Sequence, residues 1–405
     1  MSARFLFTFG TQIQSVVLGW QMYTLTKNPL YLGLIGLVEA IPALGLALVA
    51  GYMVDRSRPL VVLRRVLEVS LISAVVLLIS QMSWLEAGTQ FQILALFLSS
   101  FLTGVARAFS QPAIFAIVPR MMDREGLTRA SAWMTSSLQI ARITGPAAGG
   151  LFYGWFGVAS SALIVCGVLV MAIVTVLLIE ISLAPIVSKV TETRRTELLS
   201  GARFVAHHPI LLPALTLDMI SVLFGGVTAL LPIYAAEILK VGPKGLGALR
   251  AAPAVGAAVT SLWLATVDIR QRAGVWLLSS VLGFGLCILT FAFSRSYSLS
   301  LSALAFSGAF DSVSMVVRTL AVQLSSPDSM RGRISAVNSI FIGSSNELGE
   351  FESGVAARLL GAVPAAVLGG IVCLLTVAAV ALVCPHLRAL DLHNLEMTPA
   401  PAEAI

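Results

Sequence analysis

The candidate functional residues in this sequence are charged side chains that interrupt long apolar runs. A charge in hydrocarbon is costly, so such residues usually line a protein interior or a water-filled path for ions, protons or substrates. Buried carboxylates can carry protons, and guanidinium groups can hold anions. The pattern predicts a substrate and proton site drawn from Glu39, Arg107, Arg142, Asp218, Asp311, Arg318 and Glu347.

Sequence spacing relates several of these charges to one another. Asp311 and Arg318 are seven residues apart, which places them on one face of a helix. An offset of 204 residues between the two halves pairs Arg107 with Asp311. The same offset pairs Arg142 with Asn346, which is adjacent to Glu347. We expect Arg107 to anchor an anion and Asp311 or Asp218 to carry a proton. The alternative is a set of ion pairs that only hold the helices together.

The composition identifies the elements that must position these charges. Of 405 residues, 57% are apolar and 11% are charged, and the mean hydropathy is +0.92. Ordinary soluble domains carry about 25% charged residues, so a soluble domain, a disordered chain, a coiled coil and a nucleic-acid-binding protein are excluded. A transmembrane helix needs about 20 apolar residues. Continuous runs of that length, without the alternation of barrel strands, predict an all-α polytopic protein of the lipid bilayer.

The apolar runs predict twelve transmembrane helices. They cover about 4–26, 29–53, 60–83, 90–118, 127–153, 156–180, 205–238, 245–266, 273–293, 297–324, 333–360 and 362–384. When the N-terminus is placed inside, most of the 26 Lys and Arg residues fall in the inner segments. The positive-inside rule therefore places both termini in the cytoplasm.

The two halves of the chain resemble each other. Ala40–Gly45 reads like Ala251–Gly256, and Arg129–Ala132 reads like Arg333–Ala336. Six spans is an even number, so both copies insert with the same polarity, and an axis along the membrane normal relates them. The expected organisation is an N-terminal six-helix bundle, a cytoplasmic linker, a C-terminal six-helix bundle and a loose cytoplasmic tail, at 1–185, 186–204, 205–386 and 387–405.

Two motifs are candidates for gating. The segment from Gly51 to Arg56 ends in Asp55-Arg56, in the loop after the second span, and resembles the signature loop of the major facilitator superfamily. Its glycine permits close helix packing, and the Asp55 carboxylate can pair with an arginine and hold the cytoplasmic side closed. The alternative is a basic loop with a turn.

The fifth span holds the second motif, Gly145-Pro146-Ala147-Ala148-Gly149-Gly150, which matches the signature of proton-coupled exporters in that superfamily. Pro146 is expected to bend the helix, and Gly145, Gly149 and Gly150 are expected to let another helix approach closely. The alternative is ordinary packing of small residues.

Helix 1 is expected to line the central cavity in this fold, so Gln14 is a candidate substrate contact. The four cysteines and four histidines show no metal-ligand spacing, and no histidine lies inside a span. The sequence therefore predicts no metal site, no catalytic residues and no enzyme. The expected energy source is the proton gradient, with no bound cofactor.

Within the superfamily, the chain resembles the branch of enterobactin-exporter-like and macrolide-efflux-like transporters. The resemblance rests on four segments: the sequence Gly10–Gln14 in the first span, the loop around Asp55, the helix 4 region and the sequence Asn346–Gly354. It implies two pseudo-symmetric six-helix bundles in a bacterial inner membrane. It also implies export of a siderophore or similar amphipathic metabolite by proton antiport, in a monomer that binds a small molecule and protons but no nucleic acid.

Three other functions remain open at this point. Multidrug or macrolide efflux predicts many weakly related apolar substrates. Siderophore import reverses the direction of transport. A lipid flippase of the same fold predicts a wide apolar cavity with its charges near one leaflet.

Overall fold

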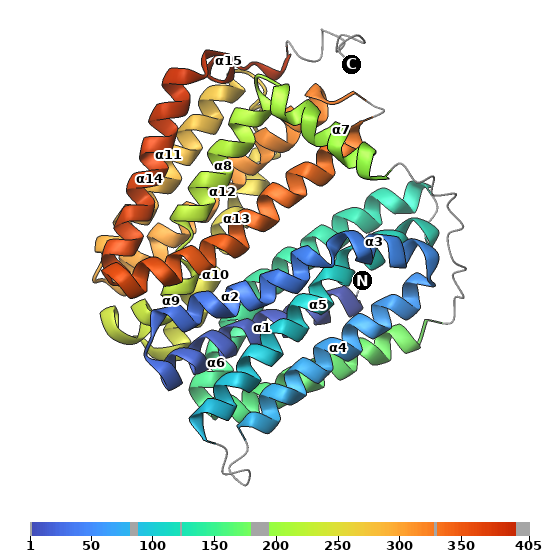
Figure 1. The fold of residues 1–405 in the computed structure, drawn as a ribbon, viewed down its shortest axis with the longest axis vertical. Coiled ribbons are helices and arrows are strands. Elements are labelled where there is room, and N and C mark those ends of the chain that lie inside the picture. The colour runs from blue at the N-terminus through green and yellow to red at the C-terminus, as the bar shows by residue number, and fades with distance from the viewer. Residues whose placement is uncertain (1, 82–87, 122–123, 180–193, 328–329, 394–405) are drawn as a thin grey trace. The chain divides into compact units, whose positions relative to one another are not determined.

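The structure is a computed structural model of the 405-residue chain. It describes all residues except 1, 82–87, 122–123, 180–193, 328–329 and 394–405. The described residues form helices and no strands (Figure 1). This confirms the predicted all-α class.

Six helices make up the described part of the first half. Asn28 caps α2 by accepting a hydrogen bond from the Leu30 amide, and Pro29 and Pro59 occupy first-turn positions where their missing N–H groups cost nothing. The helices are α1 (Ser2–Thr26), α2 (Pro29–Gly45), α3 (Ala47–Arg56), α4 (Pro59–Ser80), α5 (Thr89–Met121) and α6 (Arg124–Leu177).

The second half opens with a helix in the predicted linker. Its elements are α7 (Arg194–His207), α8 (Leu211–Gly225), η2 (Thr228–Leu230), α9 (Leu231–Ile233), η3 (Tyr234–Ile238), α10 (Gly242–Leu264), α11 (Ala273–Phe293), α12 (Tyr297–Ser325), α13 (Arg331–Leu360), α14 (Ala362–Val383) and α15 (Pro385–Arg388).

Four predicted spans are shaped differently from the expectation. The second divides at Leu46 into α2 and α3. The fifth and sixth join in α6, where Gly157 turns the chain with a φ of 76° that only glycine adopts readily. The seventh, expected as one helix over 205–238, is wrong as a continuous element. It begins after Pro209 and loses its α-helical pattern beyond Gly225, passing through 3₁₀, α and π turns.

The described chain forms two compact units. Unit 1 comprises Met1–Lys189 and Thr228–Ala251, and unit 2 comprises Val190–Val227 and Ala252–Ile405. In unit 1, α6 packs along α1, and α4 packs against α5 (Figure 1). In unit 2, α14 packs against both α8 and α11. The predicted boundaries of the two bundles remain predictions, since unit 1 also takes a segment from the second half.

Seven helices among the described residues are long and apolar enough to cross a membrane. One of these, Trp133–Leu177, is a 45-residue segment that contains the turn at Gly157. Large apolar side chains such as Leu178, Leu262 and Leu382 are exposed, as expected for surfaces that meet lipid. The total of twelve spans remains a prediction.

Matching glycines support the predicted duplication. A Cβ on Gly104 would overlap the Glu39 carbonyl and the Pro42 ring, and a Cβ on Gly308 would overlap the backbone of Pro253. Gly104 and Gly308 are repeat partners, and so are Pro42 and Pro253. The same glycine-to-proline helix contact therefore recurs in each unit and brings the helix backbones close together.

The tail expected to be loose from residue 387 begins as packed structure. Leu387, Leu390 and Leu392 are buried, and the Gly274 amide donates a hydrogen bond to the Leu390 carbonyl. Three leucines spaced along this short segment bury enough apolar surface to dock it on the start of α11. The rest of the predicted tail, 394–405, lies outside the described residues.

Candidate functional site

A buried ion pair joins α8 and α12 in unit 2. The Arg318 Nη1 atom lies 2.5 Å from the Asp218 Oδ2 atom, and their side chains are only 5% and 8% exposed. The two residues are one hundred positions apart, so this pairing arises from tertiary packing rather than from helical spacing. Both charges are among the predicted site residues, but helical spacing alone relates Arg318 to Asp311 instead.

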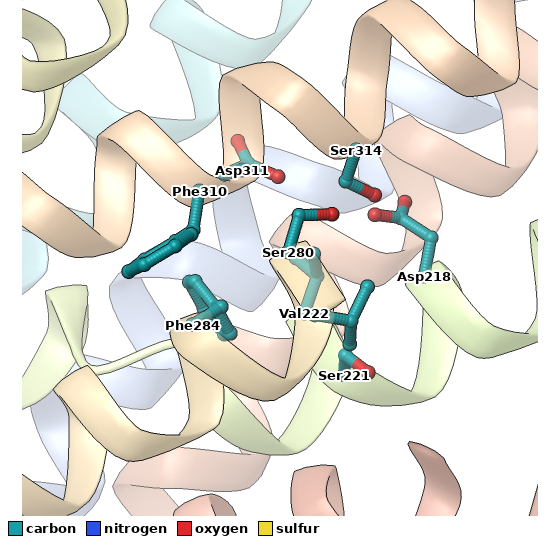
Figure 2. A pocket seen from close by; sticks show the side chains of 9 residues that line it. Asp218, Ser221, Val222, Ser280, Phe284, Phe310, Asp311 and Ser314 are labelled. Carbon is teal, nitrogen blue, oxygen red and sulfur yellow. The ribbon is translucent and has the colours of Figure 1, made fainter. Parts of the chain in front are cut away.

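Asp311 adds a second carboxylate beside this pair. Its charge interacts with both Arg318 and Asp218, and it lines a small cavity with Asp218 (Figure 2). The cavity is about 10 Å³, roughly the room for one water molecule. Its other lining residues are Ser221, Val222, Ser280, Val281, Phe284, Phe310 and Ser314.

The polar groups around this cavity are incompletely satisfied. Figure 2 shows the Ser280 and Ser314 hydroxyl groups directed toward the Asp218 carboxylate. Ser314 Oγ and Arg318 Nε are buried without a hydrogen-bond partner among the described residues. Buried polar groups without partners are costly, so the cavity favours a water molecule or proton that would complete its hydrogen bonding.

Unit 1 carries a different charge arrangement. Arg107 of α5 lies 2.5 Å from Glu39 of α2, measured between Nη1 and Oε1, with side chains 45% and 17% exposed. The two charges come together because Gly104, one turn before Arg107, lets α5 touch the α2 backbone at Glu39. Arg107 is therefore positioned at an accessible surface, as an anion anchor requires.

Arg142 of α6 belongs to the same surface of unit 1. It is exposed, and its charge interacts with Arg107. Arg4 of α1 is half-buried and interacts with Arg142 in turn. Arg4 is not among the predicted site residues, because it stands at the edge of an apolar run rather than inside it.

Gln14 lies away from this surface, inside the packing of α1 with α4 and α5. It is 1% exposed, and its Nε2 atom donates to Ser73 Oγ at 2.7 Å and to Ser99 Oγ at 2.9 Å. Ser73 also contacts Thr103 Oγ1 at 3.1 Å. The geometry favours a structural role for Gln14, and the predicted substrate contact has no support in it.

Glu347, the last predicted charge, is buried on α13 in unit 2. The neighbouring Asn346, repeat partner of Arg142, is exposed and turns its amide to the Ile342 carbonyl at 2.8 Å. Arg107 and Asp311 belong to different units, so the predicted alignment of the two at equal depth remains a prediction.

The first gating motif falls at the end of α3. Gly51 does not serve close packing, because a Cβ there would meet no atom within 4 Å. Arg56 hydrogen-bonds the Tyr52 hydroxyl and stacks on its ring, with the guanidinium carbon 4.2 Å from the ring centroid. The Asp55 side chain lies outside the described residues, so its predicted ion pair remains a prediction.

The second motif packs as expected. A Cβ on Gly145 would lie 2.6 Å from Gln12 Cβ, and one on Gly149 would lie 3.0 Å from the Ile13 carbonyl. Gly150 approaches the start of α10, where its Cβ would lie 2.7 Å from Gly247 Cα. The predicted close helix approach is confirmed. The departure from helical backbone within α6 is at Gly157, so the predicted bend at Pro146 remains a prediction.

Side-chain contacts missed by sequence analysis reinforce this packing. The Tyr23 hydroxyl hydrogen-bonds Glu237 in the π-helical turn η3. Lys244 lies over the Trp155 ring, with Nζ 5.2 Å from the centroid. Single π turns recur at functional sites. The available signal was Glu237, an acid five residues after Pro232 that interrupts an otherwise apolar run.

Comparison with known proteins shows that the chain is a multi-pass membrane transporter rather than an enzyme. The chain belongs to the transmembrane secretion effector family of the major facilitator superfamily, whose sequence profile matches residues 2–404. The family confirms the predicted superfamily, which sequence analysis reached through the two gating motifs.

Among characterised relatives, the enterobactin exporter EntS of Escherichia coli O1:K1 / APEC is 27% identical over 247 residues. The match covers 60% of this chain and 58% of that protein. EntS of Shigella boydii serotype 18 matches to the same extent. The aligned stretch therefore spans less than two thirds of the relatives' length.

Solved transporter structures share the fold. A POT family transporter in complex with 5-aminolevulinic acid superposes with a TM-score of 0.76 at 13% identity, covering 95% of each chain. A point mutant of the nucleoside transporter NupG superposes with a TM-score of 0.72 at 13% identity, covering 94% of this chain and 98% of that one. At this identity the similarity concerns the fold alone.

Proposed function

We propose that this protein exports a siderophore or a similar amphipathic metabolite across a bacterial inner membrane, in exchange for protons. The proposal places both termini in the cytoplasm and treats the monomer as the working unit. Similarity to the enterobactin exporters supports the substrate class and direction, and the charges in unit 2 support the coupling to protons.

The observation that carries the proposal is the group of Asp218, Asp311 and Arg318, in which Asp218 and Arg318 are buried and Asp311 is partly buried. Two ionised carboxylates beside one guanidinium leave a net negative charge in a site with little access to water. An uncompensated buried charge is strongly unfavourable. Binding one proton neutralises the group, so the site is suited to load and release a proton as its access to water changes.

Alternating access uses this property. With a proton bound, the group is neutral and fits a dry interior. When the site opens to water, the cost of charge falls and the proton can leave. Movement of the carrier then depends on whether the proton is bound, which is the requirement for antiport. The small cavity between Asp218 and Asp311 gives a water molecule room to hand the proton over.

The test combines metabolite profiling with a matched pair of variants. Cells with and without the protein are starved of iron, and mass spectrometry measures iron chelators inside the cells and in the medium. We expect a chelator to accumulate in cells that lack the protein. Altered accumulation of added dyes or macrolides, with no chelator difference, would instead indicate multidrug efflux.

The variants are Asp311→Asn and Asp268→Asn. Asp268 has a side chain that is 59% exposed, outside the buried group, so its variant serves as the control. In proteoliposomes with an imposed pH gradient, Asp311→Asn should lose gradient-driven flux by at least about tenfold, and Asp268→Asn should keep it. Gradient-driven flux retained in Asp311→Asn would refute the proposed proton site.

A further inference from the structure

The packing of α1 on α6 brings two arginines to the same level of unit 1. Gly145 faces Gln12, and Gly149, four residues later, faces Ile13 and Val16. The contact thus advances in the same direction along both helices, so the helices are parallel. Arg142 stands one turn before Gly145 and therefore lies beside the first turns of α1, where Arg4 is located.

Side-chain direction brings the guanidinium groups closer still. Long helical side chains lean toward the N-terminus of their own helix, so Arg142 extends toward the level of Arg4. The charge of Arg142 interacts with Arg4 on one side and with Arg107 on the other. The charge of Arg142 thus links those of Arg4 and Arg107, and we call these three residues of α1, α5 and α6 the arginine triad.

The triad carries more positive charge than its described surroundings balance. Glu39 pairs with Arg107 at 2.5 Å. Arg4 and Arg142 form no hydrogen bond or ion pair with any residue that the structure describes. Like charges held close together repel, and arginines in a membrane-spanning region are costly without a counter-charge. Among the described residues, the charges of Arg4 and Arg142 therefore remain without a directly paired counter-charge.

The geometry points to the arginine triad as a binding site for a dianionic group on the exported molecule, such as two neighbouring carboxylates or acidic phenols. This inference rests on the proposed function, and it adds Arg4 and a charge requirement to it. The planar guanidinium fork suits paired oxygen atoms, which Arg4 and Arg142 have free donors to receive. Glu39 would compete with the ligand for Arg107. This competition lowers the affinity for the ligand and so favours ligand release at low ligand concentration.

The test uses benzoate and phthalate, which share one ring and differ by one carboxylate. Binding to the full-length protein is measured by calorimetry in nanodiscs of phosphatidylcholine. We expect phthalate to bind at least about tenfold more tightly than benzoate, since one extra charge-assisted contact of this kind is worth a factor of that size. Equal affinities for the two acids would overturn the inference without any variant.

Variants then locate the binding. Arg4→Gln and Arg142→Gln should each weaken phthalate binding about tenfold and leave benzoate less affected. Arg142→Lys should retain part of the preference, because it keeps the charge but not the fork. Arg295→Gln removes an exposed arginine outside the triad and should change nothing. Unchanged phthalate binding in both glutamine variants would overturn the assignment.

Two further outcomes separate this inference from others. Loss of phthalate binding when phosphatidylglycerol is added to the discs would assign the site to a lipid headgroup and overturn it. Asp311→Asn should bind phthalate normally while losing gradient-driven flux. Charge-dependent binding without proton-driven flux would refute only the proposed function, and proton-driven flux with equal benzoate and phthalate affinities would refute only the arginine triad.

Discussion

The two units hold ion pairs of the same length in opposite environments. Arg107–Glu39 in unit 1 and Arg318–Asp218 in unit 2 both have an N–O distance of 2.5 Å. The first arginine is 45% exposed and the second is 5% exposed. Distance alone therefore says little about the role of a pair. In unit 1 the arginine remains accessible to solvent, and in unit 2 both charges are shielded from it.

The largest predicted effect tests this contrast directly. Arg318→Met leaves the buried Asp218 carboxylate and the partly buried Asp311 carboxylate without a counter-charge and should reduce the free energy of unfolding by about 3–5 kcal/mol. Arg107→Met removes an exposed partner and should cost about 0–1 kcal/mol. Unfolding by denaturant in detergent measures both. Equal losses would mean that burial does not distinguish the two pairs.

The second prediction asks whether unit 1 depends on backbone packing more than on its charges. Gly150→Ala places a Cβ 2.5 Å from the Pro243 carbonyl and should destabilise the protein by about 1–3 kcal/mol. Gly51→Ala meets no atom within 4 Å and should be neutral or stabilising, since alanine favours the helix. The melting temperatures of the two variants check this, and a loss in Gly51→Ala would contradict it.

The third prediction concerns the neutral polar network that unit 1 buries where unit 2 buries charges. Gln14→Leu removes the hydrogen bonds to Ser73 and Ser99, but these serines retain a mutual contact in which Ser73 Oγ donates to the Ser99 carbonyl at 2.7 Å. The expected loss is about 1 kcal/mol. Transport should persist, because the side chain is buried. Abolished transport in a stably folded Gln14→Leu variant would restore the predicted substrate contact.

The smallest predicted effect is a pH dependence at the edge of unit 2, outside the spans. His208 Nδ1 accepts hydrogen bonds from the Ile210 and Leu211 amides at 3.2 Å, and burial lowers the pKa of His208 from its ordinary value of 6.5. The lowered pKa means that the unfolded segment binds more protons below pH 6.5. Stability is therefore full above that pH and falls as the pH decreases, by about 1 kcal/mol or less for a helix cap.

Hydrogen exchange of the Ile210 and Leu211 amides measures this effect after correction for intrinsic rates. His208→Asn provides the control, because asparagine can cap the helix without titrating in this range. Protection that responds to pH equally in the wild type and in His208→Asn would show that another group is responsible.

Sequence patterns predicted the helical class and nearly all the helix positions because hydropathy is a local property. The bounds of α11 and α12 lie within a residue or so of the expected ranges. The seventh span was wrong because Pro209, the glycines after Phe224 and Pro232 outweigh its apolar character. The polar helix α7 was missed because a polar stretch between spans resembles a linker.

The site could be predicted in part. Placement inside apolar runs was enough to name Asp218, Asp311 and Arg318. The pairing of Asp218 with Arg318 depends on how α8 meets α12, which no spacing along the chain encodes. Arg4 was missed because it stands at the edge of an apolar run, and its electrostatic interaction with Arg142 arises from the packing of α1 on α6.

Unit 1 is built from two separate segments of the chain, with part of unit 2 between them in the sequence. This affects how the gene can be divided. Residues 1–189 supply most of unit 1, but Gly150 and Tyr23 meet their partners Gly247 and Glu237 in a segment that is synthesised only later. When the ribosome has synthesised only the first half of the chain, unit 1 is therefore still incomplete. When 1–189 and 190–405 are expressed as two polypeptides, the first should remain prone to degradation until the second arrives.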